Sequence, residues 1–165
     1  MRRHVYLATT VAVMTALVVL AASVVTLASP ASGVTPMQLS RGTVEDFKVR
    51  SYPQGPGDFK AESKGPTDIV VRQHDYAVGS HTGWHSHPGP VFITVTKGVL
   101  TYYEYDDPKC TPHEVRVGQT FVDNGRGHIV RNLSGEPAQD ISVIIAPVAG
   151  AFRGELDAPG PYCGF

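Results

Sequence analysis

Two histidines of this chain are spaced so that both could bind one metal ion. His85 and His87 stand in the stretch GWHSHP with a single residue between them. Successive side chains of a β-strand point to opposite faces, so both imidazoles project from one face if this stretch is extended. Two imidazoles at this separation can converge on one ion at nitrogen–metal distances of about 2.0 to 2.2 Å. Pro88 follows directly and ends regular strand pairing.

Two stretches of the chain resemble the two conserved motifs of the cupin superfamily. In the first motif a glycine precedes His-x-His, and a glutamate and a second glycine follow. Gly79, His85, His87 and Gly98 fall in register with it. In the second motif a glycine and a Pro-x-Gly turn lead to a histidine and an asparagine, and GQTFVDNGRGHIVRN, residues 118–132, is similar to it. The resemblance implies an all-β single domain with the cupin double-stranded β-helix, a jelly-roll-like barrel.

The sequence departs from the first motif at its acidic position. Val91, or Phe92 at the alternative spacing, stands where cupins have a glutamate ligand. The ligand set that the resemblance implies is therefore His85, His87 and His128, with the remaining coordination positions open to water or substrate. This set resembles that of the cupin thiol and diketone dioxygenases, which hold ferrous iron by three histidines.

Imidazole ligands alone do not select the metal, so the expected cofactor is a divalent transition metal, whether Fe, Zn, Ni, Cu or Mn. Open coordination positions suit a Lewis-acid or oxygen-activating role. Two functions follow. One is a metal-dependent enzyme for a small molecule, most concretely a three-histidine Fe(II)-type dioxygenase; the other is a non-catalytic sensor or carrier that binds a small ligand or metal at the cell surface. A third interpretation keeps the histidines as hydrogen-bonding groups of a pocket that binds no ion.

Three polar residues near the expected site are candidates for acid–base roles. Asp123 stands close to the turn before the third histidine, where it would act as a base or orient a ligand. Glu104 shares strand parity with Leu100, and it would place a carboxylate near the ion if that face is the inner one. His81 lies in a loop before the first motif's histidines and is either a pocket acid or base or simply exposed.

The remaining side chains around the motifs are expected to have structural roles. Val91, Ile93 and Val95 would keep the pocket apolar if their parity follows the ligand position. His74 and His113 lie at polar strand positions, so we expect both at the surface.

Short β-type runs must position these residues. From residue 68 onward, runs rich in Val, Ile, Thr, Tyr and Phe are separated by Gly, Pro and Asn-Gly turn signals, at intervals typical of antiparallel barrels. We expect an irregular N-terminal arm over residues 32–67 with one short strand at residues 44–49. The barrel then covers residues 68–150, and residues 151–165 form a C-terminal tail.

The pattern of the N-terminal residues predicts an export signal. Two arginines in residues 1–4 precede an uncharged apolar run over residues 5–28. Cleavage after Ala31 would make residues 1–31 a signal peptide. The run is also long enough to cross a hydrocarbon core of about 30 Å, so an uncleaved signal anchor is the alternative. Both place the domain outside the cytoplasm, either secreted or at the outer face of the cell membrane.

The two cysteines, Cys110 and Cys163, would then lie in an oxidising compartment. An even number of cysteines there usually means a disulfide, which would pin the tail. Two free thiols or two thiolate metal ligands are the alternatives.

Charge and composition limit the partners. The chain has 15 acidic and 14 basic residues, a net charge of -1, and so lacks the basic excess of a nucleic-acid-binding protein. A membrane would be a partner only through an uncleaved N-terminal segment. The expected partner is a small-molecule ligand, and the resemblance adds a homodimer, because cupins commonly dimerise.

Overall fold

The computed structural model describes residues 29–51 and 57–165, so the expected leader lies outside the described residues except for its last three. The described chain consists of strands and one short 3₁₀-helix, η1 (Gly160–Tyr162). The strands are β1 (Ser32–Val44), β2 (Phe47–Arg50), β3 (Lys60–Ser63), β4 (Thr67–His81), β5 (His85–Ser86), β6 (Val91–Lys97), β7 (Val99–Glu104), β8 (His113–Arg116), β9 (Thr120–Asp123), β10 (His128–Arg131), β11 (Ala138–Pro147) and β12 (Gly154–Glu155).

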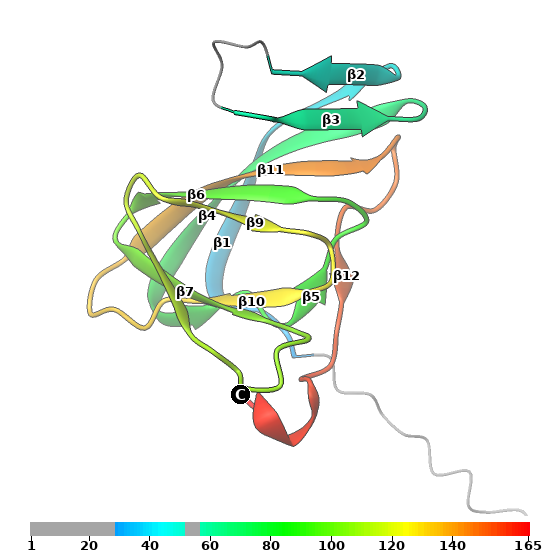
Figure 1. Cartoon of the computed structure of the whole chain (residues 1–165). Helices are drawn as coiled ribbons and strands as arrows, with labels where there is room; N and C mark the ends of the chain where they lie inside the picture. Colours follow the sequence, from blue (N-terminus) through cyan, green and yellow to red (C-terminus); the bar gives the residue numbers. More distant parts are fainter. Residues whose placement is uncertain (1–28, 52–56) are drawn as a thin grey trace, which may run out of the picture.

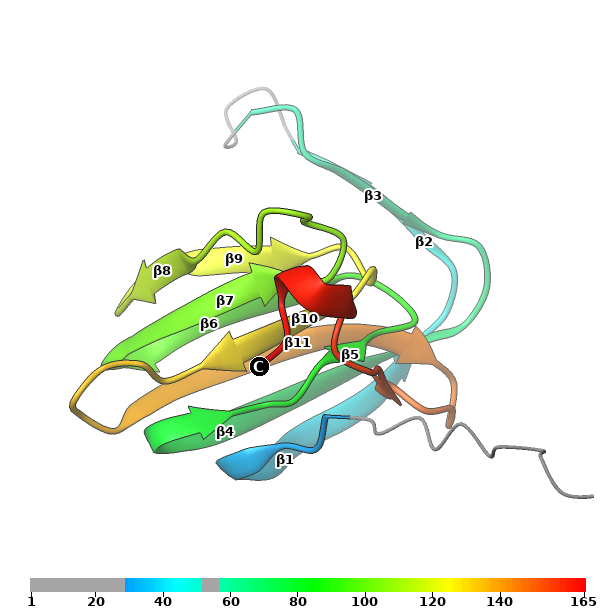
Figure 2. The same ribbon diagram turned by 90° about the horizontal axis from the view of Figure 1, so that it is seen from below.

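Two antiparallel layers face each other across the interior (Figure 1). One layer has the order β1-β4-β11-β6-β9 and the other β8-β7-β10-β5-β12. A single register pair, Arg131 with His81, joins β10 to β4 and so connects the layers. The β2–β3 hairpin lies outside the barrel in both views (Figures 1 and 2). The predicted all-β, jelly-roll-like barrel is confirmed.

Alternating side chains build the interior of this barrel. Along β11 every second residue is buried, and β6 buries Val91, Ile93 and Val95. Strand alternation places these residues on one face, where they pack with Leu100 of β7 and Ile144 of β11 in the main core. Gly98 makes the tight β6–β7 connection with a φ of 69°, a backbone conformation that suits glycine.

The N-terminal arm differs from the expectation. Residues 32–44 are not irregular but form β1, which pairs with β4 from Val44 opposite Thr67 to Ser32 opposite His81. The strand predicted at residues 44–49 is interrupted, because the chain turns at Glu45 and Asp46; β1 ends at Val44 and β2 covers Phe47–Arg50. Most residues of β1 are exposed, so its sequence lacks the alternation of apolar and polar residues that would predict a strand. Its proline is tolerated because β1 is an edge strand.

The C-terminal tail is part of the fold. β12 pairs with β5, and Cys163 is bonded to Cys110 in the loop between β7 and β8, with the two Cα atoms 5.4 Å apart. Cys163 and Trp84 are buried in a second small core, where Trp84 also stacks on Phe165. Figure 2 shows the tail, in red, lying beside β5 and β10. The predicted disulfide is present and joins the tail to the barrel.

No helix in the described residues has the length and apolar character needed to cross a membrane.

We expect loss of the disulfide to destabilise the protein by about 4 kcal/mol, since the bridge closes a long loop in the unfolded chain. The Cys110→Ser/Cys163→Ser variant should show this decrease in the free energy of unfolding in urea, measured by the fluorescence of Trp84, the single tryptophan.

Reductant should destabilise the wild type by the same amount and leave the double variant unchanged. A wild type whose unfolding is insensitive to reductant would contradict the expectation.

Candidate metal centre

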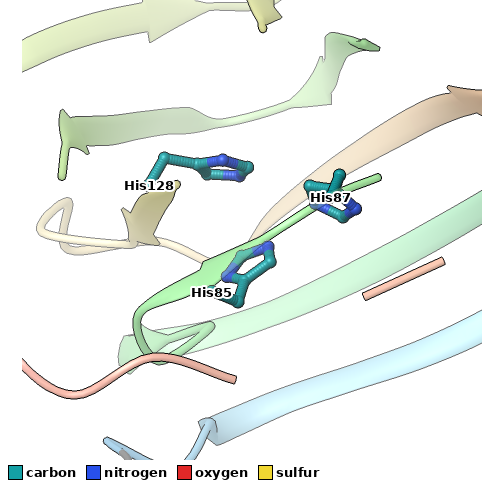
Figure 3. Close-up of side chains that lie close together, drawn as sticks. All are labelled: His85, His87 and His128. Atoms are coloured by element: carbon teal, nitrogen blue, oxygen red, sulfur yellow. The ribbon is translucent and has the colours of Figure 1, made fainter. Parts of the chain in front are cut away.

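Three histidine side chains from neighbouring strands lie together inside the barrel (Figure 3). His85 begins β5, His87 directly follows that strand, and His128 begins β10 opposite His85 in the register. Their ring centroids are 4.4 to 5.5 Å apart. One ligating nitrogen of each ring lies within 4.8 Å of the others. The fold thus brings together the three residues that the sequence proposes as ligands.

The turn between β9 and β10 fits closely against the His-x-His segment. Gly125 of this turn has a φ of 90°, and a Cβ atom added there would lie 2.9 Å from the carbonyl oxygen of His87. Such a contact is too short for a side chain, so the residue must be glycine for the turn to approach. The motif glycine therefore places His128 beside the other two rings.

Backbone carbonyl groups fix the rings of His85 and His87. His85 Nδ1 lies 2.9 Å from the carbonyl oxygen of Gly83, and His87 Nδ1 lies 2.6 Å from that of Phe152. A carbonyl oxygen only accepts hydrogen bonds, so in both rings Nδ1 donates and carries the proton. The Nε2 atoms of His85 and His87 then keep their lone pairs, which is the state that a metal ligand needs.

Asp123 orients the third ring. Its Oδ2 lies 3.3 Å from His128 Nδ1, at ion-pair distance but without the alignment of a good hydrogen bond, and its Oδ1 accepts from the backbone N–H of Gly125. Burial acts to raise the pKa of Asp123, but the interactions with His128 and Gly125 outweigh it, so the pKa lies below its usual value. Asp123 is thus an anion behind His128.

Burial makes the first two histidines neutral. The pKa of His85 lies well below its usual value because of burial and then the charges of His128, Arg153 and His87. The pKa of His87 is lowered to about 4, again by burial first and then by His128. Both rings are therefore neutral near pH 7, and a metal ligand must be deprotonated.

A cavity of about 390 Å³ opens in front of the histidines. Val91 and Ile93 line it, as their strand parity predicts, whereas Val95 is buried in the core. The volume is within the range of small-molecule sites, near its lower end. Among the described residues, the group of ligating atoms contains no carboxylate, in line with Val91 at the motif's acidic position.

Several polar cavity residues escaped the sequence analysis. They come from the inner faces of β4 and β11 and from the tail, and they are Arg72, Tyr76, Asp140, Ser142, Arg153 and Glu155. The apolar side chain of Phe152, also in the tail, lines the cavity beside them. On β4 and β11 the available signal was strand parity, since these side chains lie an even number of residues from core residues such as Val70 and Ile144 and so share their face. No local pattern places the tail at the cavity.

The expectation that His74 lies at the surface is wrong. Its side chain is 16% exposed, it lines the cavity, and its Nδ1 lies 2.8 Å from Oδ1 of Asp140. His74 shares the inner face of β4 with Tyr76, whose hydroxyl donates to the other oxygen of Asp140. His113 is half-buried, with its ring stacked on Tyr102.

The other acid–base candidates, His81 and Glu104, do not line the main cavity. His81 does not line the cavity, and its Nδ1 accepts from the backbone N–H of Gly83. Glu104 is exposed at the end of β7, opposite His128 in the register. It lines a second, smaller hollow of about 40 Å³, which Asp123 and His128 also line.

Comparison with known proteins agrees with the topology. The family described as "Cupin domain" matches residues 73–144. None of the curated proteins compared with the chain matches it.

Similar solved structures have low sequence identity. The polyketide cyclase RemF from Streptomyces resistomycificus is 18% identical over 81% of this chain and 80% of its own, with a TM-score of 0.49. A double-stranded β-helix protein from Klebsiella pneumoniae is 21% identical over 67% and 84%, with a TM-score of 0.46. A protein of unknown function from Streptococcus pyogenes is 24% identical over 48% and 65%, with a TM-score of 0.41. We draw no function from these similarities.

The barrel topology and the matched region define an all-β protein with a histidine-lined cavity between two sheets. The match of residues 73–144 to the cupin domain family, together with this topology, supports membership of the cupin superfamily.

We expect the metal-free protein to lose stability as the pH falls from about 6.5 to about 4. The lowered pKa of His87, about 4 against a usual 6.5, means that the unfolded chain binds this proton more tightly than the folded protein. Protonation therefore favours unfolding, by roughly 3 kcal/mol across this window for His87, and His85 acts in the same direction. Urea unfolding in chelator at the two ends of the window measures the loss.

The His87→Gln variant should depend less on pH, whereas His113→Gln, outside the cavity, should keep the wild-type dependence. Equal stability of the wild type at both ends of the window would show that burial does not hold these rings neutral.

Proposed function

We propose that the protein is an exported cupin that holds a divalent transition metal ion on His85, His87 and His128. It acts on, or binds, a small molecule in the adjacent cavity. The observation that carries the proposal is the convergence of three buried or half-buried imidazoles whose Nδ1 atoms face carbonyl or carboxylate oxygens. This arrangement leaves Nε2 as the free nitrogen of each ring and matches the outer-sphere support that metal-binding histidines have.

The spacing of the rings is compatible with an ion of this class. Two nitrogens on one ion cannot be more than about 4.2 Å apart, twice the metal–nitrogen distance. The ligating atoms span up to 4.8 Å. One ring must therefore move inward by roughly half an ångström for all three to bind. Nitrogen ligands with open positions beside them suit iron, zinc, nickel or copper.

In its most concrete form the proposal is a three-histidine Fe(II)-type dioxygenase. A ferrous ion bound there supplies the one-electron and dioxygen chemistry that protein side chains lack. The protein holds the imidazoles in one tautomer, and its cavity receives the substrate. Val91, Ile93 and Phe152 give that cavity apolar walls, which limit the access of water.

A non-catalytic sensor or carrier is the second candidate, and the hydrogen bonding of the cavity favours it. Asp140 accepts from Tyr76 and Ser142 and contacts His74, while Glu155 accepts from Arg153. Among the described residues, neither of these lining carboxylates is left as a free general base. An enzyme at this site would depend on the ion for its chemistry, whereas a binding protein needs no such group.

The location of the domain is part of the proposal. The apolar N-terminal run and the disulfide between Cys110 and Cys163 both support an extracytoplasmic protein, because disulfides persist in oxidising compartments.

We expect about one metal ion per chain in protein purified without a metal-affinity tag, because the three imidazoles form one site. The His85→Ala/His87→Ala variant should lose this metal. Asp123→Asn should weaken metal binding about 10- to 100-fold, since Asp123 orients His128. Elemental analysis after dialysis and competition with a chelator measure both effects.

The matched control is His81→Ala/His113→Ala, which also removes two histidines but none that lines the cavity. Absence of stoichiometric metal from the wild type, or an equal loss in the control variant, would refute the metal site.

We expect the iron-loaded protein to consume dioxygen with at least one member of a panel of thiols, diketones and phenolic acids. The reaction should require His128, because the third ligand completes the site. An oxygen electrode gives the rate. If the iron-loaded protein consumes no dioxygen with any member of the panel, the result would favour the sensor or carrier.

A further inference from the structure

One cation on the cavity wall has no ion-pair partner among the described residues. Arg72 lies on β4 and shares the inner face of that strand with the buried residues Val70 and Tyr76. It lines the same cavity as the three histidines. Its Nε atom is buried without a hydrogen-bond partner, and its guanidinium takes part in none of the ion pairs of the described chain. Burying part of a charge without a partner costs free energy of folding, so such a group in a cavity is a candidate for binding a ligand of opposite charge.

The charged neighbours of Arg72 are already engaged. Asp140 uses Oδ1 for His74 and Ser142, and its Oδ2 accepts from the Tyr76 hydroxyl. Arg153 donates to Glu155 and to a backbone carbonyl, and so its own charge is paired.

The positive charge of Arg72 is therefore poorly compensated. Burial lowers the pKa of Arg72, the charge of Arg153 lowers it further, and Asp140 offsets only part of this. The net effect disfavours the cation, which an anion entering the cavity would reverse.

Phe152 links this cation to the histidines. The guanidinium carbon of Arg72 lies 4.8 Å from the centroid of the Phe152 ring, a cation–π distance that orients the planar group. The carbonyl oxygen of Phe152 also accepts from Nδ1 of His87. One residue of the tail thus contacts both this cation and one of the three imidazoles, and both groups line the same cavity.

We propose that the cavity binds a small organic monocarboxylate, with its carboxylate on Arg72 and its apolar body along Val91, Ile93 and Ile144 toward the histidines. The inference rests on the proposed function, because it names the class of molecule that the metal would meet. The planar guanidinium matches a carboxylate in a two-pronged hydrogen bond. A phosphate dianion fits less well, because the cavity offers one unpaired cation and holds the carboxylate of Asp140.

Calorimetric titration of the metal-free protein tests this directly. The probes are benzoate and 3-phenylpropionate, their amides, and phenylphosphonate. We expect the two acids to bind more tightly than the amides and the phosphonate. Arg72→Gln should weaken binding of the acids by about tenfold or more and leave the amides unchanged, since a charged hydrogen bond is lost. Arg116→Gln, an exposed arginine outside the cavity, is the matched control and should bind as the wild type does.

The folding of the variant is checked independently. The Tm of Arg72→Gln should be unchanged or higher, because the side chain lacks an ion pair. Arg72→Lys keeps the charge but loses the planar fork, so it should retain a weaker preference for acids over amides.

Failure of this inference is distinguishable from failure of the metal site. Three results would overturn the carboxylate site alone, if the protein binds metal: equal affinities for acids and amides, a higher affinity for the phosphonate, or no binding of any probe. Retention of the acid preference by Arg72→Gln also overturns it. Protein that holds no metal but shows an acid preference dependent on Arg72 refutes only the metal.

Discussion

Three imidazole rings packed within 5.5 Å of one another inside a barrel cannot all be charged. Each protonated ring would lose its water and repel the others, and the lowered pKa values of His85 and His87 express this. A neutral buried ring still needs a partner for its N–H. The carbonyl groups of Gly83 and Phe152 are those partners, so they decide the tautomer and leave Nε2 free. Burial and two backbone carbonyls thus prepare the rings as nitrogen ligands.

The C-terminal tail contacts the histidine site and is joined to the barrel. It supplies the carbonyl group of Phe152, the strand β12 beside β5, and Cys163, which is bonded to the β7–β8 loop. The segment around His85 is a strand of only two residues, too short to be held by its own pairing. β12 of the tail pairs with this strand, and Gly125 of the β9–β10 turn lies close to the carbonyl oxygen of His87. The disulfide therefore supports the site as well as the stability of the fold.

The cavity exists because two strands present polar residues to the interior. β4 and β11 place Arg72, Asp140 and Ser142 on the face that elsewhere carries the apolar core. Apolar side chains of similar size there would extend that core. The paired carboxylates stabilise the wall, whereas the unpaired guanidinium gives it a preference for anions. The cavity thus has histidines, apolar residues and a positive charge on different parts of its wall.

Composition, strand-type runs and the two histidine motifs determine the all-β class, the cupin resemblance and the three candidate ligands, because turn chemistry and motif spacing are local properties. β1 escaped sequence analysis because an exposed edge strand needs no apolar alternation. The sequence also did not show that His74 and Asp140 face inward, since a period of two does not say which face is buried. The approach of Phe152 to His87 joins residues far apart in the chain. Only the tertiary structure decides such contacts, because they depend on how the sheets close and where the disulfide holds the tail.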